Sequence, residues 1–147
     1  MKWIVGIDEV GRGPVAGPAA VCACAILYKD YKKLKYLKFT DSKRMSEKSR
    51  NIWYKSFLEM EKRGEIKFSI AYKSNIFIDK NGISKSLRDC IATALKDLSL
   101  DPKETTVLLD GALRAPGIYK NQKTIIKGDQ KEKIISLASI IAKVARD

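Results

Sequence analysis

The chain has 147 residues and contains no histidine. This absence excludes imidazole general bases, nucleophilic triads that depend on histidine, and zinc sites that need histidine ligands. Acid, base or metal chemistry must therefore rest on carboxylates and lysines. The chain also has no apolar run of bilayer-spanning length, and its N-terminus enters a strand pattern at Trp3 and Ile4 without the layout of a signal peptide. We therefore expect a cytoplasmic protein that does not enter a membrane.

Cysteine is scarce, with three residues and no C-x-x-C spacing of the kind found in redox or zinc sites. Cys22 and Cys24 alternate along an apparent strand, and Cys90 lies on the apolar face of a predicted helix. Because free cysteine is among the most buried residue types, we interpret all three as small core residues.

Acidic residues are few relative to basic ones. The chain has 17 Asp and Glu against 29 Lys and Arg, which gives a formal charge of +12. An excess of this size favours a polyanionic partner, with nucleic acid ahead of an anionic membrane surface. A lysine-rich surface without any polyanionic partner is the alternative explanation, and charge alone does not decide between them.

Apolar segments of strand length alternate with amphipathic helical patterns along the chain. Strands are predicted over 3–7, 19–27, 66–72, 105–109 and 123–126, and helices over 47–63, 83–98 and 134–147. An initial hairpin followed by strands and helical crossovers predicts an α/β fold with a mixed five-stranded sheet flanked by helices. No repeat or linker divides the chain, so we expect one domain over 1–147.

Three segments between these elements need separate comment. Ser46 is the expected N-cap of the first helix, Gly64 is its expected stop, and 75–82 is predicted as a loop. The segment 28–38 mixes lysines with tyrosines. It fits either a nucleic-acid contact, with stacking tyrosines and phosphate-binding lysines, or a solvated, locally helical connector with its leucines tucked in. The last predicted helix has no stop signal, so the chain ends within a helical pattern.

Carboxylates follow three of the predicted strands. Asp8 and Glu9 end the first, Asp110 ends the fourth, and Asp129 follows the fifth. Strand ends lie side by side in such sheets and ligands bind in the crevice there, so we expect these four acids to converge. Clustered carboxylates repel one another unless a hard cation accepts their oxygens, which indicates Mg²⁺ or Mn²⁺. Ordinary solvated strand ends and Asp-Gly turns remain the alternative.

A carboxylate-only site with two ions about 3.5–4 Å apart is suited to phosphodiester hydrolysis and needs no histidine. The turn Gly11-Arg12-Gly13 follows the first acid pair. Its bare backbone can approach a sugar edge and test for a 2′-hydroxyl, and Arg12 can hold a phosphate. A dinucleotide-binding turn is disfavoured because Pro14 lacks an amide donor and 19–27 is a strand where a helix is required.

Four stretches, IDEVGRGPVAGP, TDSKRMSEKSR, LLDGALRAP and IIKGDQKEKIISLASIIAKVARD, resemble the type 2 ribonucleases H, the ribonuclease HII family. The resemblance runs from one end of the chain to the other, and its D-E-x-G-R-G motif is highly specific. It implies a ribonuclease-H-like fold and a metal-dependent endonuclease. The implied substrates are RNA/DNA hybrids and single ribonucleotides in duplex DNA, cut on the 5′ side of the ribonucleotide to leave a 3′-hydroxyl and a 5′-phosphate.

The resemblance also assigns roles to individual residues. Asp8, Glu9, Asp110 and Asp129 match the family's metal-binding acids, Gly11, Arg12 and Gly13 its ribose-sensing loop, Ser42 and Lys43 a phosphate contact, and Ser139 and Lys143 residues near the strand. For Ser139, a buried hydroxyl that caps its own helix turn is an equally good account.

The resemblance has one departure, at the end of the chain. Family members continue past the final R-D with a further helical segment that supplies a tyrosine and backbone contacts, and no counterpart is present in this sequence. We therefore expect a partly uncovered apolar face over 134–144. A monomeric endonuclease is the first prediction, and a core that grips RNA/DNA duplexes without cutting them is the alternative.

Overall fold

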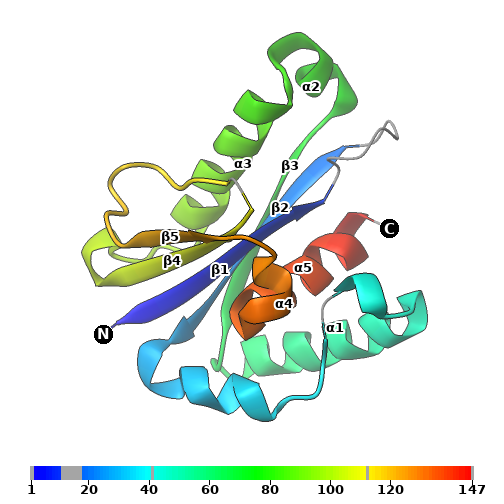
Figure 1. The fold of residues 1–147 in the computed structure, drawn as a ribbon, viewed down its shortest axis with the longest axis vertical. Helices are drawn as coiled ribbons and strands as arrows, with labels where there is room; N and C mark the ends of the chain where they lie inside the picture. The colour runs from blue at the N-terminus through cyan, green and yellow to red at the C-terminus, as the bar shows by residue number, and fades with distance from the viewer. Residues whose placement is uncertain (1, 11–17, 41, 112, 147) are drawn as a thin grey trace.

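The structure is a computed structural model that describes residues 2–10, 18–40, 42–111 and 113–146. Five strands form one mixed sheet in the order β3-β2-β1-β4-β5, and helices cover both of its faces (Figure 1). The strands are β1 (Trp3–Val10), β2 (Ala19–Leu27), β3 (Lys67–Lys73), β4 (Thr105–Asp110) and β5 (Gln122–Ile125). This arrangement confirms the predicted α/β fold with a mixed five-stranded sheet.

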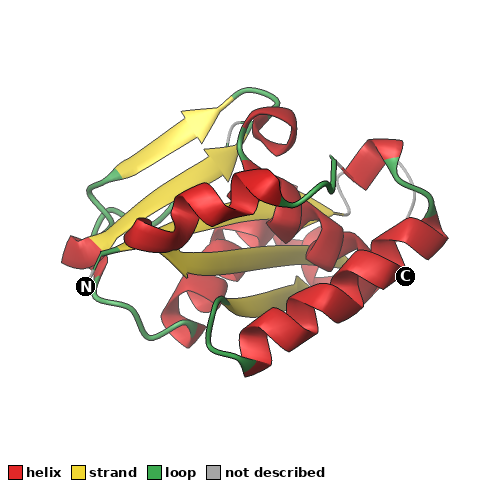
Figure 2. Ribbon diagram, turned by 90° about the horizontal axis from the view of Figure 1, so that it is seen from below, coloured by secondary structure: helices red, strands yellow, loops and turns green. Residues whose placement is uncertain are grey.

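The strand β1 lies at the centre of the sheet. It pairs antiparallel with β2, as the predicted hairpin requires, and parallel with β4, while β4 pairs parallel with β5. The central position explains why its first residues read as a continuous apolar run, because such a strand is buried on both faces. Figure 2 shows the twist of the strands and the helices packed along them.

One face of the sheet is covered by α3 (Ile83–Asp97), which the short helix α2 (Asn75–Asn81) precedes. Alternate residues of β1, Val5 and Ile7, are fully buried in this layer with Leu87 of α3. The prediction of a loop over 75–82 is wrong, because the side chain of Ser74 accepts a hydrogen bond from the backbone N–H of Phe77 and caps a two-turn helix there.

The opposite face is covered by α5 (Lys133–Arg146) and by α1 (Glu47–Lys62). The helix α5 lies directly against β1. A Cβ added to Gly6 would stand 2.5 Å from the backbone carbon of Ile134, a distance that real Cβ atoms do not show. Ser46 caps α1 by accepting a hydrogen bond from Ser49 N–H at 3.0 Å, as predicted.

The helix α5 does not have the uncovered apolar face that the sequence predicted. All nine residues from Ile134 to Ala142 are buried, and only Val144 of the predicted apolar positions is partly exposed. The covering comes from the sheet on one side and from Leu34, Phe39 and Phe57 on the other. The three cysteines are buried and free, as predicted.

The remaining described elements are short. They comprise the 3₁₀ helices η1 (Tyr28–Tyr36), η2 (Ser42–Arg44) and η3 (Pro102–Glu104) and the single-turn helix α4 (Gly128–Lys131). In η1, the burial of Leu34 agrees with the connector interpretation, while Tyr28 and Tyr36 are exposed and the role of this segment in nucleic-acid binding stays a prediction. No helix among the described residues is long and apolar enough to span a bilayer.

Candidate active site

Asp8 and Asp110 come together because β1 and β4 are parallel neighbours. Ile7 pairs with Leu109 in the register, so each acid is the next residue along its own strand. Side chains alternate along a strand, and both acids point to the face covered by α5, the face that also receives Ile4 and Leu108. The fold therefore places two carboxylates side by side at the carboxyl ends of its central strands.

The carboxylate of Asp8 is the most electrostatically constrained of the acids. Its side chain is 5% exposed, and it accepts hydrogen bonds from Glu9 N–H at 2.8 Å and from the Ser139 hydroxyl. Burial, followed by the negative charge of Asp110, raises the pKa of Asp8 well above its usual range, while the two hydrogen bonds oppose that rise. The half-buried Glu9 adds a further negative charge that raises this pKa.

Asp110 joins β4 to the segment that carries Asp129. Its Oδ1 accepts a hydrogen bond from Gly128 N–H at 2.6 Å. A Cβ on Gly128 would stand 2.7 Å from Cδ1 of Ile135 and 3.3 Å from Oδ1 of Asp110, so a larger residue there would require these side chains to shift. Asp129 follows in the first turn of α4, 5% exposed, rather than directly at the end of a strand.

Lys143 of α5 lies within electrostatic reach of both ends of this acidic group. Burial, and then the charges of Arg50 and Lys43, lower the pKa of Lys143, while Asp8 and Asp129 act in the opposite direction. The site thus has a cationic side made of Lys43, Arg50 and Lys143 beside its acidic side. A negatively charged ligand can therefore bind close to the acids, because the cations offset part of the repulsion between the ligand and the carboxylates.

The donors present fit a hard divalent cation in chemistry, although they do not enclose one. Among the residues that the structure describes, no group of three or more Asp, Glu, Cys or His side chains is close enough to hold a metal ion. Asp8 and Asp110 are brought together with Glu9 beside them, whereas Asp129 is linked to them through Gly128 and Lys143. Buried, mutually repelling oxygen ligands are the set that Mg²⁺ and Mn²⁺ prefer.

The structure also places the predicted nucleic-acid contacts. Lys43 is exposed and Lys143 is partly buried, but Ser42 has no exposed surface and its hydroxyl lies 2.6 Å from that of Ser139. Ser139 thus contacts Ser42 and Asp8, which argues against the simple helix-capping role. Gly11, Arg12 and Gly13, the predicted ribose-sensing loop, lie outside the described residues.

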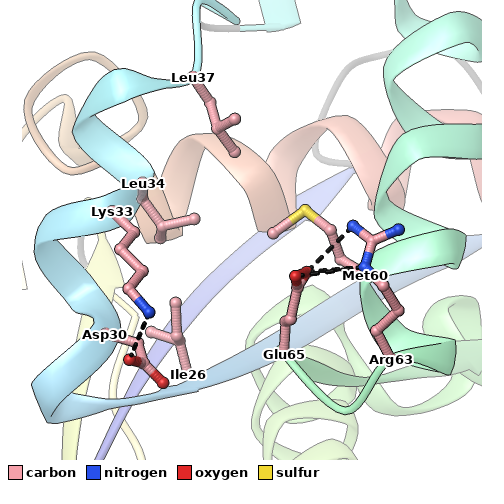
Figure 3. A pocket seen from close by; sticks show the side chains of 8 residues that line it. All are labelled: Ile26, Asp30, Lys33, Leu34, Leu37, Met60, Arg63 and Glu65. Carbon is pink, nitrogen blue, oxygen red and sulfur yellow. Dashed lines mark hydrogen bonds and ion pairs between the residues drawn. The ribbon is translucent and has the colours of Figure 1, made fainter.

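Two hollows lie in the surface of the protein, of which one adjoins the candidate site and the other does not. A polar hollow of about 430 Å³ adjoins Asp129. It is lined by Phe39, Thr40, Arg44, Asp129, Gln130, Lys131, Glu132, Lys133 and Ser136. A smaller one of about 240 Å³, between η1 and α1, has an apolar base and ion pairs from Lys33 to Asp30 and from Arg63 to Glu65 (Figure 3). It lies beside Ile26 of β2, which pairs with Ile4 near the start of β1 and away from Asp8, and none of the four acids is among its lining residues.

Sequence reasoning missed residues that organise the site without reacting. Gly128 binds Asp110, and Arg50 donates to the carbonyl oxygens of Ser42 at 3.3 Å and Met45 at 2.8 Å. The glycine before Asp129 was a usable signal, since a glycine beside an acid allows close backbone approach. No local sequence signal identifies Arg50, because its acceptors, the carbonyl oxygens of Ser42 and Met45, are positioned by η2 and the residue that follows it.

A sheet of this order, with acids at the ends of its central parallel strands and a helix lying directly across them, defines a ribonuclease-H-like α/β protein. The sequence model of ribonuclease HII matches residues 5–147, and the chain belongs to that family.

Two curated relatives and one solved structure illustrate the similarity. The chain is 39% identical over 148 residues to ribonuclease HII of Fusobacterium nucleatum subsp. nucleatum, covering 99% of this chain and 65% of that protein. It is 39% identical over 146 residues to ribonuclease HII of Lachnoclostridium phytofermentans, covering 99% of this chain and 53% of that one. The crystal structure of ribonuclease H2 from Pyrococcus horikoshii OT3 superposes with a TM-score of 0.78 at 26% identity, covering 99% of this chain and 72% of that chain. The chain thus spans between about half and two thirds of the length of these two curated relatives.

Proposed function

We propose that this chain is the catalytic core of a metal-dependent endoribonuclease. Its substrates are RNA in RNA/DNA hybrids and single ribonucleotides embedded in duplex DNA. Cleavage falls on the 5′ side of the ribonucleotide and leaves a 3′-hydroxyl and a 5′-phosphate. The observation that carries the proposal is the pair Asp8 and Asp110, held against each other at the ends of adjacent parallel strands in a chain of the ribonuclease HII family.

The acids form the reacting side of the proposed site. Asp8, Glu9, Asp110 and Asp129 would hold Mg²⁺ or Mn²⁺, which when bound supplies an activated water and steadies the leaving oxygen. The burial of Asp8 beside Asp110 supports this role, because such a carboxylate gains most from a positive partner. The hydrogen bond from Gly128 holds Asp110 in one orientation, which limits the reorganisation needed when a ligand arrives.

The cations form the binding side. Lys43 is exposed and Lys143 lies near both Asp8 and Asp129, so the two ammonium groups are available to substrate phosphates close to the acids. Gly11, Arg12 and Gly13 take the role of sensing the ribose 2′-hydroxyl, as the family resemblance implies. The single-domain organisation over 1–147, the monomeric state and the cytoplasmic location stay predictions.

A nicking assay tests the proposal directly. A DNA duplex with one embedded ribonucleotide is incubated with the protein and Mg²⁺ or Mn²⁺, and the products are resolved by length and end group. We expect a nick 5′ to the ribonucleotide and none in the matched all-deoxyribose duplex. Asp110→Asn should reduce the rate by at least ~100-fold, since it removes one of the acids that hold the ion, while leaving metal-free duplex binding intact.

Duplex binding without nicking would favour the other function considered, a core that grips RNA/DNA duplexes without cutting them. That outcome would show as salt-sensitive binding in fluorescence anisotropy together with no product in either metal. A wild-type nicking rate in Asp110→Asn would instead refute the four-acid site. Equal cutting of the ribose and deoxyribose duplexes would refute the ribose-sensing role.

A further inference from the structure

We propose that Ser42 and Ser139 are positioning residues that hold the carboxylate of Asp8 through a chain of two hydrogen bonds, and that Ser42 does not contact substrate. This inference rests on the proposed function, since it assigns Asp8 to metal binding. It differs from the role that sequence similarity gives Ser42, a phosphate contact.

The direction of the chain follows from the number of protons available. As a metal ligand Asp8 is ionised and can only accept, so in that form the Ser139 hydroxyl donates its single proton to the Asp8 carboxylate. The Ser139 oxygen is then the acceptor in its 2.6 Å contact with Ser42, so the Ser42 hydroxyl must be the donor. The result is an ordered sequence from Ser42 to Ser139 to Asp8, in which each hydroxyl orients the next.

Burial separates this role from substrate binding. Ser42 has no exposed surface and Ser139 is 5% exposed, so neither hydroxyl is presented to a duplex. Lys43, the next residue, is exposed and remains a side chain of this turn that can reach a phosphate. Ser42 therefore lies in the protein interior on the side of the acids, whereas Lys43 faces solvent.

The segment before Ser42 is fastened to α5 in register with that chain. Residues 37–40 together with Ser42 are called the strap here. Lys133 Nζ donates to the carbonyl oxygens of Leu37, at 2.8 Å, and Phe39, and lies over the Phe39 ring at 4.2 Å. Ser136 Oγ donates to the carbonyl oxygen of Thr40 at 2.9 Å.

The fastening residues of α5 are spaced three apart, at Lys133, Ser136 and Ser139, and therefore lie on one face of the helix. The strap runs along this face in the same direction as the helix, so each contact limits the position of the strap residues that make the next contact. The final contact of the series is the one that reaches Asp8. A strap held at three points along a helix is a rigid support, which is what a group that orients a carboxylate requires.

The test measures the binding of Mn²⁺ alone by isothermal titration calorimetry. Ser139→Ala should weaken Mn²⁺ binding by ~10-fold or more, the usual effect of removing a group that orients a metal ligand. Ser42→Ala should weaken it by a smaller factor, ~3-fold, because it acts through Ser139. The double variant should match Ser139→Ala alone, since the two residues act in series. Ser139→Thr keeps a hydroxyl and should restore most of the affinity.

Two further measurements exclude other accounts. Duplex affinity in EDTA should stay within ~2-fold of wild type in Ser42→Ala, and nicking should lose kcat at constant KM. Ser86→Ala is the matched control for stability. Ser86 is also fully buried and its hydroxyl donates to the Gly82 carbonyl oxygen at 2.7 Å, but it lies in α3 on the other face. This control should unfold at a lower temperature and bind Mn²⁺ normally.

The outcomes separate the two proposals. Asp8→Asn should abolish measurable Mn²⁺ binding; if it does not, the proposed function fails. If Asp8→Asn abolishes binding but both serine variants bind Mn²⁺ as wild type does, the positioning role alone is wrong. A loss of ~5-fold or more in the metal-free duplex affinity of Ser42→Ala, with unchanged Mn²⁺ binding, would return Ser42 to the substrate.

Discussion

Asp8 occupies a position that costs folding stability when no cation is present. Its carboxylate is buried beside Asp110 and next to Glu9, and hydrogen bonds from Glu9 N–H and Ser139 offset part of this cost. A folded-state pKa raised above the unfolded value means that the folded protein holds its proton more tightly than the unfolded chain does. The stability from this group is therefore present at low pH and is lost as pH rises through the raised pKa.

Replacing Asp8 by Asn should stabilise the metal-free protein at neutral pH. The variant keeps an acceptor for Ser139 and removes the buried charge, so we expect the thermal midpoint in EDTA to rise by ~3 °C, corresponding to ~1 kcal/mol in a chain of this size. The difference between variant and wild type should grow as pH rises from ~4, where a carboxyl begins to ionise, and should shrink below it. Differential scanning calorimetry across pH measures both. A variant less stable than wild type at pH 7 would contradict the buried-charge account.

At the scale of elements, the contact between β1 and α5 sets the depth at which the helix lies over the acids. Gly6→Ala would place a Cβ 2.5 Å from the Ile134 backbone carbon and 2.6 Å from its oxygen. Backbone cannot yield as a flexible side chain does, so α5 must shift, and we expect a loss of at least ~2 kcal/mol in denaturant unfolding. Gly117→Ala is the control, because a Cβ there meets nothing within 4 Å. Equal stability of the two variants would contradict the close packing.

The sequence predicted the elements that depend on local pattern. The range of β2 matched its apolar run residue for residue, and Ser46 capped α1 as its side-chain chemistry required. The helix α2 escaped prediction because it has no buried residue, so no apolar periodicity marked it, although Ser74 is a recognisable N-cap. Local chemistry therefore located caps and buried strands well and a short surface helix poorly.

The residues of the candidate site also differ in whether the local sequence pattern predicts their positions. Asp8 and Asp110 were found because both follow apolar strands, and neighbouring parallel strands bring their ends together. The contact between Ser42 and Ser139 joins residues 97 apart in sequence, and its partners are fixed only when η2 docks against α5. Asp129 was placed at a strand end but lies within α4, because Lys127 takes a left-handed backbone, with φ of 55°, and ends the extended segment before it.

At the scale of the whole molecule, the charge of +12 should make duplex binding strongly salt-dependent. Each phosphate contact contributes a slope of about 0.9 in a plot of log affinity against log salt. Lys143→Ala should reduce that slope by ~1, because its ammonium lies beside the acids of the proposed site. Lys103→Ala removes the same charge from η3, at the amino end of β4 and away from the acids, and should leave the slope unchanged. Anisotropy titrations at several salt concentrations decide this, and equal slopes for both variants would show that Lys143 touches no phosphate.

The packing of α5 on β1 also governs the order in which the chain can fold. Gly6 and Ile134, which meet backbone to backbone, are separated by nearly the whole sequence. The hairpin of β1 and β2 can form early because its strands are neighbours in the chain, but β1 gains its parallel partner only when β4 is available. Closing such long loops is slow and exposes apolar surface in the meantime. During synthesis, the strand that carries Asp8 therefore lacks its parallel partner until β4 has left the ribosome, and Asp8 meets Asp110 only after β4 has docked.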